Sequence, residues 1–248
     1  MNARRKQRAR RPATRRAVLR SGLEVTFGSD VGPAHPNIDM PTMDQVMSAI
    51  ESFPLESGWK EVRERVLPVF PRARPSTLEV PEMLTSVVEP GVTIGYAIDL
   101  GRVFARISEE MLARWAISPD ELYDTAMANL RREARTIGPA DVMREPSDNG
   151  YVISAIQPAG GWGSTLVLLP DELARVFGGH PQVFIAPIRA LLLSFPAYVD
   201  RATVAYFADE FEALDPTHLR LEGFVLRDGR VSIEGLPRGG PFQVAAAM

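Results

Sequence analysis

Cysteine is absent from the 248 residues of this chain. Its absence excludes disulfides, thiolate metal sites and a thiol nucleophile, and it fits a reducing compartment, so we expect a cytoplasmic protein. Histidine is scarce and scattered, occurring only as His35, His180 and His218. We therefore expect no histidine metal site, and nothing in the sequence indicates a cofactor.

Long hydrophobic runs and phosphate-binding motifs are also missing. No stretch of about 18 apolar residues exists, which argues against a membrane span. The glycine-rich loop at 160–164, GGWGS, matches neither a Walker loop nor a dinucleotide fingerprint, because its glycine spacing is wrong and the residues after it predict a strand. With no catalytic constellation in the sequence, we expect a non-catalytic binding or interaction module, for which another protein is one candidate partner, more than an enzyme.

Charge is distributed unevenly along the chain. Residues 1–20 carry nine Lys or Arg and no acid, and the remainder carries 19 basic against 31 acidic residues. Because the part of the chain after residue 20 is strongly acidic, it should repel nucleic-acid phosphates. Association with nucleic acid is therefore expected only through residues 1–20. Residues 1–39 are either a disordered basic arm or an artefact upstream of a true start at Met40 or Met43.

The central hydrophobic feature is the stretch 182–196, QVFIAPIRALLLSFP, in which Arg189 is the single charge. We interpret it as two short buried strands at the centre of the core. Strands this apolar should be covered by helices on both faces. Because hairpin signals outnumber plausible parallel crossovers, the sequence predicts an α+β fold with a mainly antiparallel sheet of hairpins alternating with helices, preceded by a small helical segment.

The chain divides into five predicted segments. Two helices are expected at its start, one from Thr42 and one from Ser57 that carries Trp59, Val62, Val66 and Val69 on one face. In order, the segments are the arm or artefact at 1–39, the two-helix segment at 40–70, a proline-rich connection at 71–92, the α+β core domain at 93–236 and a tail at 237–248.

Local signals place most elements of the core domain. Ser108 and Ser118 are expected to cap two helices, the second with Pro119 at its first position. The remaining signals predict a strand pair joined near Gly101, then a hairpin whose second strand is TLVLLP at 165–170. A helix ended by Gly178 follows, and later an amphipathic helix from Asp200 with Asp209, Glu210 and Glu212 outward. The last predicted element is a hairpin that turns at Asp228-Gly229.

A family resemblance rests on the segment from Trp115 to Leu130. Trp-Ala-Ile-Ser-Pro-Asp-Glu-Leu followed by Ala-Met-Ala-Asn-Leu resembles the YtpQ-like bacterial family of uncharacterised proteins, and other similar segments extend over roughly 93–233. The chain departs from the family pattern after Arg189, where it has Ala190 in place of an aspartate. The resemblance implies a cytosolic α+β protein and supplies no established catalytic residues.

Arg189 leads the candidate site residues. A guanidinium among apolar strands must be paired or desolvated at a cost of several kcal/mol. Arg189 is therefore either an anchor for an anionic ligand or a residue of a turn or structural pair, with an acid such as Asp99 as partner. A paired-carboxylate hydrolase would need a second acid beside Asp99, and the sequence shows none.

Three further residues complete the candidate set. The glycine-rich loop offers backbone N–H groups, Ser164 and the aromatic face of Trp162, which could bind an anion or a planar ligand, although a flexible hairpin tip is the competing interpretation. Asn129 falls on the buried face of its helix, so we expect its amide to be at least half buried. An enzyme or binding protein for an anionic small molecule, using Arg189 and this loop, is thus the alternative function.

Overall fold

The structure is a computed structural model, and the chain in it divides into two compact units, Met1–Met40 and Pro41–Met248. It describes residues 15–18, 24–27, 57–71, 83–89, 92–101, 104–214, 219 and 221–237. The helix predicted from Thr42, most of the proline-rich connection and almost all of the tail lie outside these residues.

In the first unit, β1 (Arg15–Val18) pairs with β2 (Glu24–Phe27) in an antiparallel sheet. The sequence predicts no regular structure there, so these eight residues differ from the expected disordered arm. The proposed contact of residues 1–20 with nucleic acid falls largely outside the described residues.

The second unit contains a four-stranded sheet in which β5 is the central strand. β5 pairs antiparallel with three neighbours, so the predicted strand pair on either side of Gly101 is confirmed. The strands are β3 (Val66–Val69), β4 (Thr85–Glu89), β5 (Val92–Asp99) and β6 (Phe104–Arg106).

A second sheet of six strands runs in the order β12-β11-β9-β10-β8-β7, again with only antiparallel pairs. Its central strands are the two that the apolar stretch 182–196 predicts, which confirms that prediction. The strands are β7 (Met143–Pro146), β8 (Val152–Ile156), β9 (Gln182–Ile188), β10 (Leu191–Pro196), β11 (Gly223–Arg227) and β12 (Arg230–Glu234).

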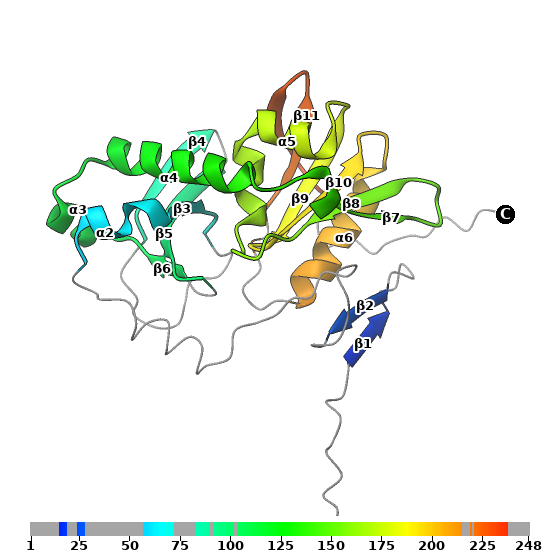
Figure 1. Ribbon diagram of the computed structural model, residues 1–248. Coiled ribbons are helices and arrows are strands. Elements are labelled where there is room, and N and C mark those ends of the chain that lie inside the picture. Colours follow the sequence, from blue (N-terminus) through cyan, green and yellow to red (C-terminus); the bar gives the residue numbers. More distant parts are fainter. Residues whose placement is uncertain are drawn as a thin grey trace, which may run out of the picture. The chain divides into compact units, whose positions relative to one another are not determined.

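Helices cover the central strands of this sheet on both faces, as their hydrophobicity requires (Figure 1). On one face, Phe195 of β10 packs against Phe207 of α6 (Arg201–Leu214), with ring centroids 5.4 Å apart. On the other, Phe184 of β9 meets Phe177 of α5 (Pro170–Phe177) at 5.2 Å. Phe184 and Phe195 point to opposite sides because side chains alternate along a strand and Phe184 is paired with Ser194.

The helices next to the four-stranded sheet begin as their caps predict. Ser108 Oγ accepts from Met111 N at the start of α3 (Glu109–Trp115), and Ser118 Oγ accepts from Glu121 N at the start of α4 (Pro119–Ala134). α4 packs along β3 (Figure 1). The remaining helical elements are α2 (Trp59–Val62) and three short 3₁₀ helices, η1 (Arg63–Arg65), η2 (Pro139–Asp141) and η3 (Gly163–Leu168).

The helix predicted from Ser57 to Val69 is wrong in its second half. α2 ends at Val62, and after η1 the chain continues as strand β3, all four residues of which are buried. β-branched residues pack well in a covered strand. Pairing with β5, in the register Val66 to Ile98, decides between strand and helix here. Pro68 is tolerated because β3 is an edge strand.

Two other predictions are corrected. The stretch after the glycine-rich loop forms the 3₁₀ helix η3 beneath β9 and β10, and β8 pairs with β7 and β10 instead. A short apolar run fits a buried strand and a buried helix equally well, which is why its pattern misled. Glu212, predicted to face solvent, is only 8% exposed.

The chain is thus an α+β protein with two antiparallel sheets, as predicted. One cluster of buried side chains joins them, and Phe70 after β3 stacks on Phe224 of β11 with centroids 6.0 Å apart. The turn at Asp228-Gly229 has positive φ at both residues, as a two-residue hairpin requires. Over the described part of the chain, no helix has the length and hydropathy of a membrane span.

Candidate functional site

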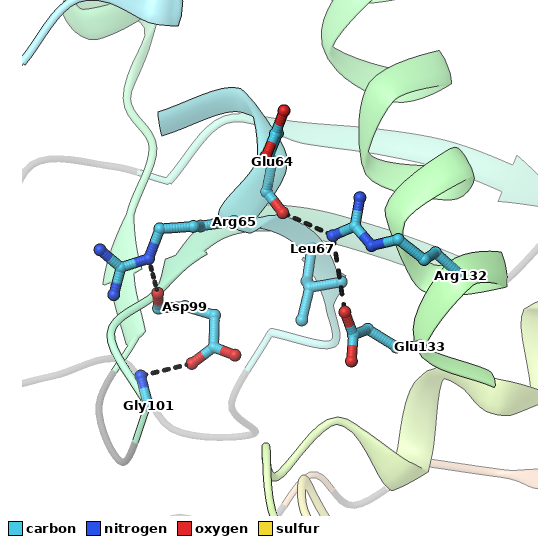
Figure 2. Close-up of a pocket in the computed structure, with 7 residues that line it drawn as sticks. All are labelled: Glu64, Arg65, Leu67, Asp99, Gly101, Arg132 and Glu133. Carbon is cyan, nitrogen blue, oxygen red and sulfur yellow. Dashed lines mark hydrogen bonds and ion pairs between the residues drawn. The ribbon is translucent and has the colours of Figure 1, made fainter. Parts of the chain in front are cut away.

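A cleft of about 260 Å³ lies where β5 ends, between that strand, η1 and α4. Most of its lining is charged, and the charges come from segments far apart in the sequence (Figure 2). The residues that line it are Glu64, Arg65, Leu67, Asp99, Gly101, Arg132 and Glu133.

Asp99 is the last residue of β5, and its half-buried carboxylate occupies one side of this cleft. Oδ1 accepts from the Gly101 N–H at 2.7 Å, across a turn in which Gly101 has φ 90°. Burial raises the pKa of the Asp99 carboxyl, opposed by the Gly101 hydrogen bond and the charge of Arg65. The Asp99 carboxyl therefore keeps its proton to higher pH than an exposed aspartate does.

Arg65 is the last residue of η1 and reaches the same strand end from the other side. Its Nε donates to the Asp99 carbonyl oxygen at 2.9 Å. The break of the predicted helix at Val62 produces this arrangement, because η1 turns the chain into β3, and β3 pairs with β5 in the register Val66 to Ile98. The backbone of β5 thus holds Arg65 at the cleft.

Arg132 on α4 is fixed by two strong contacts. Its Nη1 donates to Asn129 Oδ1 at 2.8 Å and its Nη2 donates to the Glu64 carbonyl at 2.7 Å. Asn129 in turn donates from Nδ2 to the carbonyls of Arg63 and Val66 at 2.6 and 2.9 Å. Asn129 is 5% exposed, which confirms the expected burial, and it supports Arg132 without lining the cleft itself.

Glu133 supplies the second acid that the sequence does not reveal. Its half-buried side chain comes from α4 and points toward Asp99 across Leu67 (Figure 2). Its charge contributes to raising the pKa of Asp99, as a neighbouring carboxylate must. Arg132 Nη2 lies 3.5 Å from Glu133 Oε1, so the acid pair is flanked by a guanidinium.

Arg189 lies in the two-residue turn between β9 and β10, one of the environments that the sequence leaves open. Its guanidinium carbon stands 4.0 Å from the centroid of the Phe104 ring, in a cation–π contact. Its charge lowers the pKa of Asp99, as the weakest of the contributions there. Arg189 therefore neighbours Asp99 electrostatically but does not line the cleft.

The glycine-rich loop packs against both Asp99 and the Arg189 turn. A Cβ on Gly160 would lie 3.6 Å from Asp99 Oδ2, and one on Gly163 would lie 2.5 Å from the Ala190 carbonyl oxygen. Only a glycine at position 163 permits this approach. The glycine-rich loop therefore lies beside both Asp99 and the Arg189 turn, a proximity that the spacing of these residues in the sequence does not indicate.

The loop does not present the surface that the sequence suggests. Trp162 is only 3% exposed and packs in the core, so the expected aromatic plate for a ligand is absent. Ser164 is fully buried and donates its backbone N–H to the Arg189 carbonyl at 3.0 Å. Both residues therefore anchor the loop to the sheet, and solvent cannot reach either side chain.

Three acidic residues, Glu64, Asp99 and Glu133, and two arginines, Arg65 and Arg132, line the cleft. Such a set can bind a polar ligand by charge-assisted hydrogen bonds, and a buried acid next to a second acid is also the arrangement used in general acid–base chemistry. Across the described ranges, no group of three or more His, Cys, Asp or Glu could hold a metal ion.

Sequence reasoning missed four of the charged residues at the cleft, Glu64, Arg65, Arg132 and Glu133. The pattern from Ser57 predicts one helix through Val69, which would carry Glu64 on its polar face, and no motif singles out Arg132 or Glu133 on α4. The one available signal was Asn129, since a buried amide must be satisfied by partners. Those partners are the backbone of η1 and β3 together with Arg132.

Comparison with known proteins adds no relative. The chain matches no family model, no curated protein and no solved structure.

Proposed function

We propose that this protein is a non-catalytic binding module whose ligand, a small polar molecule, occupies the cleft between Asp99 and Arg132. The observation that carries this proposal is the fixing of charged side chains from η1, β5 and α4 around one opening. Side chains already held by hydrogen bonds lose little conformational entropy when a ligand binds, so they suit recognition.

The neighbouring residues explain how the fold maintains this cleft. Asn129 holds Arg132, the β5 backbone holds Arg65, and the glycine-rich loop approaches Asp99 from behind. Among the described residues that line the cleft, none is Ser, Thr, Cys, His or Lys, the side chains most used as nucleophiles. The side chains that line the cleft therefore suit non-covalent binding of a ligand.

We also propose membership of the YtpQ-like family and a cytoplasmic location. The segment from Trp115 to Leu130, which carries the family resemblance, makes two long-range contacts in this chain. Trp115 Nε1 donates to the Ser57 carbonyl at 2.9 Å, and Asn129 Nδ2 donates to the carbonyls of Arg63 and Val66. Both residues fasten the helices to segment 57–66, on which the cleft is built. Relatives that keep both residues should therefore keep the cleft.

The test is a screen of the full chain against small amines, carboxylates, phosphates and sugars by thermal shift. A compound at 100 times its Kd adds about 2.7 kcal/mol of stability, which for a protein of this size raises Tm by roughly 5–10 °C. Glu133→Trp, at a lining position whose side chain points toward Asp99 (Figure 2), should obstruct the cleft and abolish the shift. Glu110→Trp, exposed on α3, is the matched control and should leave it intact.

Two results would overturn the proposal. One is a complete screen without a hit, and the other is a hit that Glu133→Trp and Glu110→Trp weaken equally.

A further inference from the structure

We propose that the outer edge of β12 is a dimerisation surface, at which a second copy of this chain adds its own β12 antiparallel to the first. The pairing is centred on Ser232, so a two-fold axis relates the copies, as in most symmetric dimers. Among the described strands, β12 ends the six-stranded order and pairs only with β11. None of the residues that line the cleft belongs to β12, so this inference does not depend on the proposed function.

The backbone of β12 directs alternate residues toward this edge. The two-residue turn before Arg230 makes Arg227 and Arg230 the hydrogen-bonded pair next to the turn, and the bonding alternates along the ladder from there. Every second residue of β12, beginning with Arg230, therefore directs its N–H and C=O groups to β11. Val231 and Ile233 direct theirs outward, where a further strand can bond to them.

A two-fold axis at Ser232 matches this backbone pattern. It places Val231 of each copy opposite Ile233 of the other, so that each such pair exchanges both of its N–H···O bonds. The two Ser232 residues then face each other in a pair without hydrogen bonds, where side chains stand closest and small ones fit best. Val231 and Ile233 are partly buried against the core, and an added strand would cover more of their apolar surface.

The charged side chains of β12 are self-complementary in the same register. Arg230 of each copy lies opposite Glu234 of the other, and opposite charges at such positions stabilise a strand pair. Within one chain, by contrast, Arg230 lies opposite Arg227, a like-charge pair that disfavours the hairpin. Arg201 Nη2 holds Glu234 Oε2 at 2.8 Å, so the carboxylate is already fixed and its other oxygen can accept from Arg230 of the second copy.

The other described edge strands of the second unit lack this pattern. β3 and β7 each contain a proline, which removes an N–H donor from the strand. β4 and β6 each carry charge of one sign only, from Glu89 and Arg106 respectively, so self-pairing would give them no ion pair. Addition of a strand to a sheet edge is a common mode of association, and β12 is the edge that suits a second copy of this chain.

Sedimentation equilibrium of the full chain over a concentration series tests the dimer. We expect the average mass to rise from that of one chain toward twice that value at concentrations below about 1 mM. Arg230→Glu places an acid opposite Glu234 of the second copy and should weaken association at least tenfold, because like charges directly opposite each other repel. Arg131→Glu, the same substitution at an exposed position of α4, is the matched control and should associate like the unsubstituted protein.

A mixture of two variants tests the register. Glu234→Arg alone should associate as weakly as Arg230→Glu alone, yet the two mixed should form a heterodimer in which both cross-strand pairs have opposite charges. Circular dichroism establishes that each variant is folded. A chain that stays monomeric at every concentration overturns the proposal, and so does a dimer that Arg230→Glu and Arg131→Glu weaken equally. Failure of the two folded variants to associate when mixed excludes pairing centred on Ser232 and overturns it as well.

Discussion

Replacing Asn129 with alanine should destabilise this protein far more than a typical helix substitution. Its Nδ2 donates to the Arg63 carbonyl at 2.6 Å and the Val66 carbonyl at 2.9 Å, and its Oδ1 accepts from Arg132 at 2.8 Å. With the side chain 5% exposed, water cannot easily replace these partners. The substitution therefore releases α4 from the turn between η1 and β3.

The magnitude follows from the bonds that are lost. A typical hydrogen bond contributes about 0.5–1.5 kcal/mol net, and a buried acceptor left without a donor costs about 1–3 kcal/mol. The Val66 carbonyl is buried and the Arg63 carbonyl partly so. Adding a loss at each carbonyl gives an expected decrease of about 2–4 kcal/mol in the free energy of unfolding, and a fall in Tm of roughly 5–15 °C.

Urea unfolding followed by tryptophan fluorescence and by circular dichroism measures this change, and coincident transitions justify the two-state treatment. Asn129→Asp should be at least as destabilising at neutral pH, because it turns a carboxylate toward the two carbonyls. Asp124→Ala on the exposed face of α4 should cost less than about 0.5 kcal/mol. A loss below about 1 kcal/mol for Asn129→Ala, or a loss equal to that of Asp124→Ala, would refute the reasoning.

Two further predictions concern Asp99 and the start of α4. Because burial raises the pKa of the Asp99 carboxyl above its ordinary 3.8, the folded state holds this proton more tightly, and ionisation of Asp99 lowers stability as pH rises through the folded pKa. Asp99→Asn should therefore gain Tm relative to the unsubstituted protein between pH 3 and pH 7; a constant difference contradicts this. Ser118→Ala should cost about 1 kcal/mol in urea unfolding by removing the cap, and Ser118→Asp should restore most of it; equal stability of all three proteins counts against the cap.

The features that the sequence predicts well depend on neighbours along the chain. Ser118, Pro119 and Asp228-Gly229 act within three or four residues of themselves, and the observed caps and turn match them. The apolar stretch 182–196 predicts the sheet centre because only a position covered on both faces accommodates so many apolar residues. Strand pairing with β8 and β11 then follows from the fold and not from that pattern.

The sequence places less of the candidate site. It nominates Asp99 and Asn129, one of which lines the cleft while the other supports it from behind. It also nominates Trp162 and Ser164, which the structure buries, because glycine-rich composition suggests an exposed loop whether or not a sheet covers it. Arg189 lies in the turn between the two predicted strands, one of the environments that the sequence leaves open, and its guanidinium contacts the Phe104 ring.

The amino-acid sequence by itself determined the helix starts, the hairpin turns, the central strand pair and the mixed antiparallel class, since each arises from periodicity or from backbone preferences of a few residues. Only the tertiary structure decided that 66–69 is a strand, that 163–168 is a 3₁₀ helix and that Asp99 faces Glu133. Those outcomes depend on pairs separated by 34 residues, as for Arg65 with Asp99, and 68, as for Arg132 with Glu64. Local patterns carry no information about partners at such distances, because the chain must first fold before those groups can select one another.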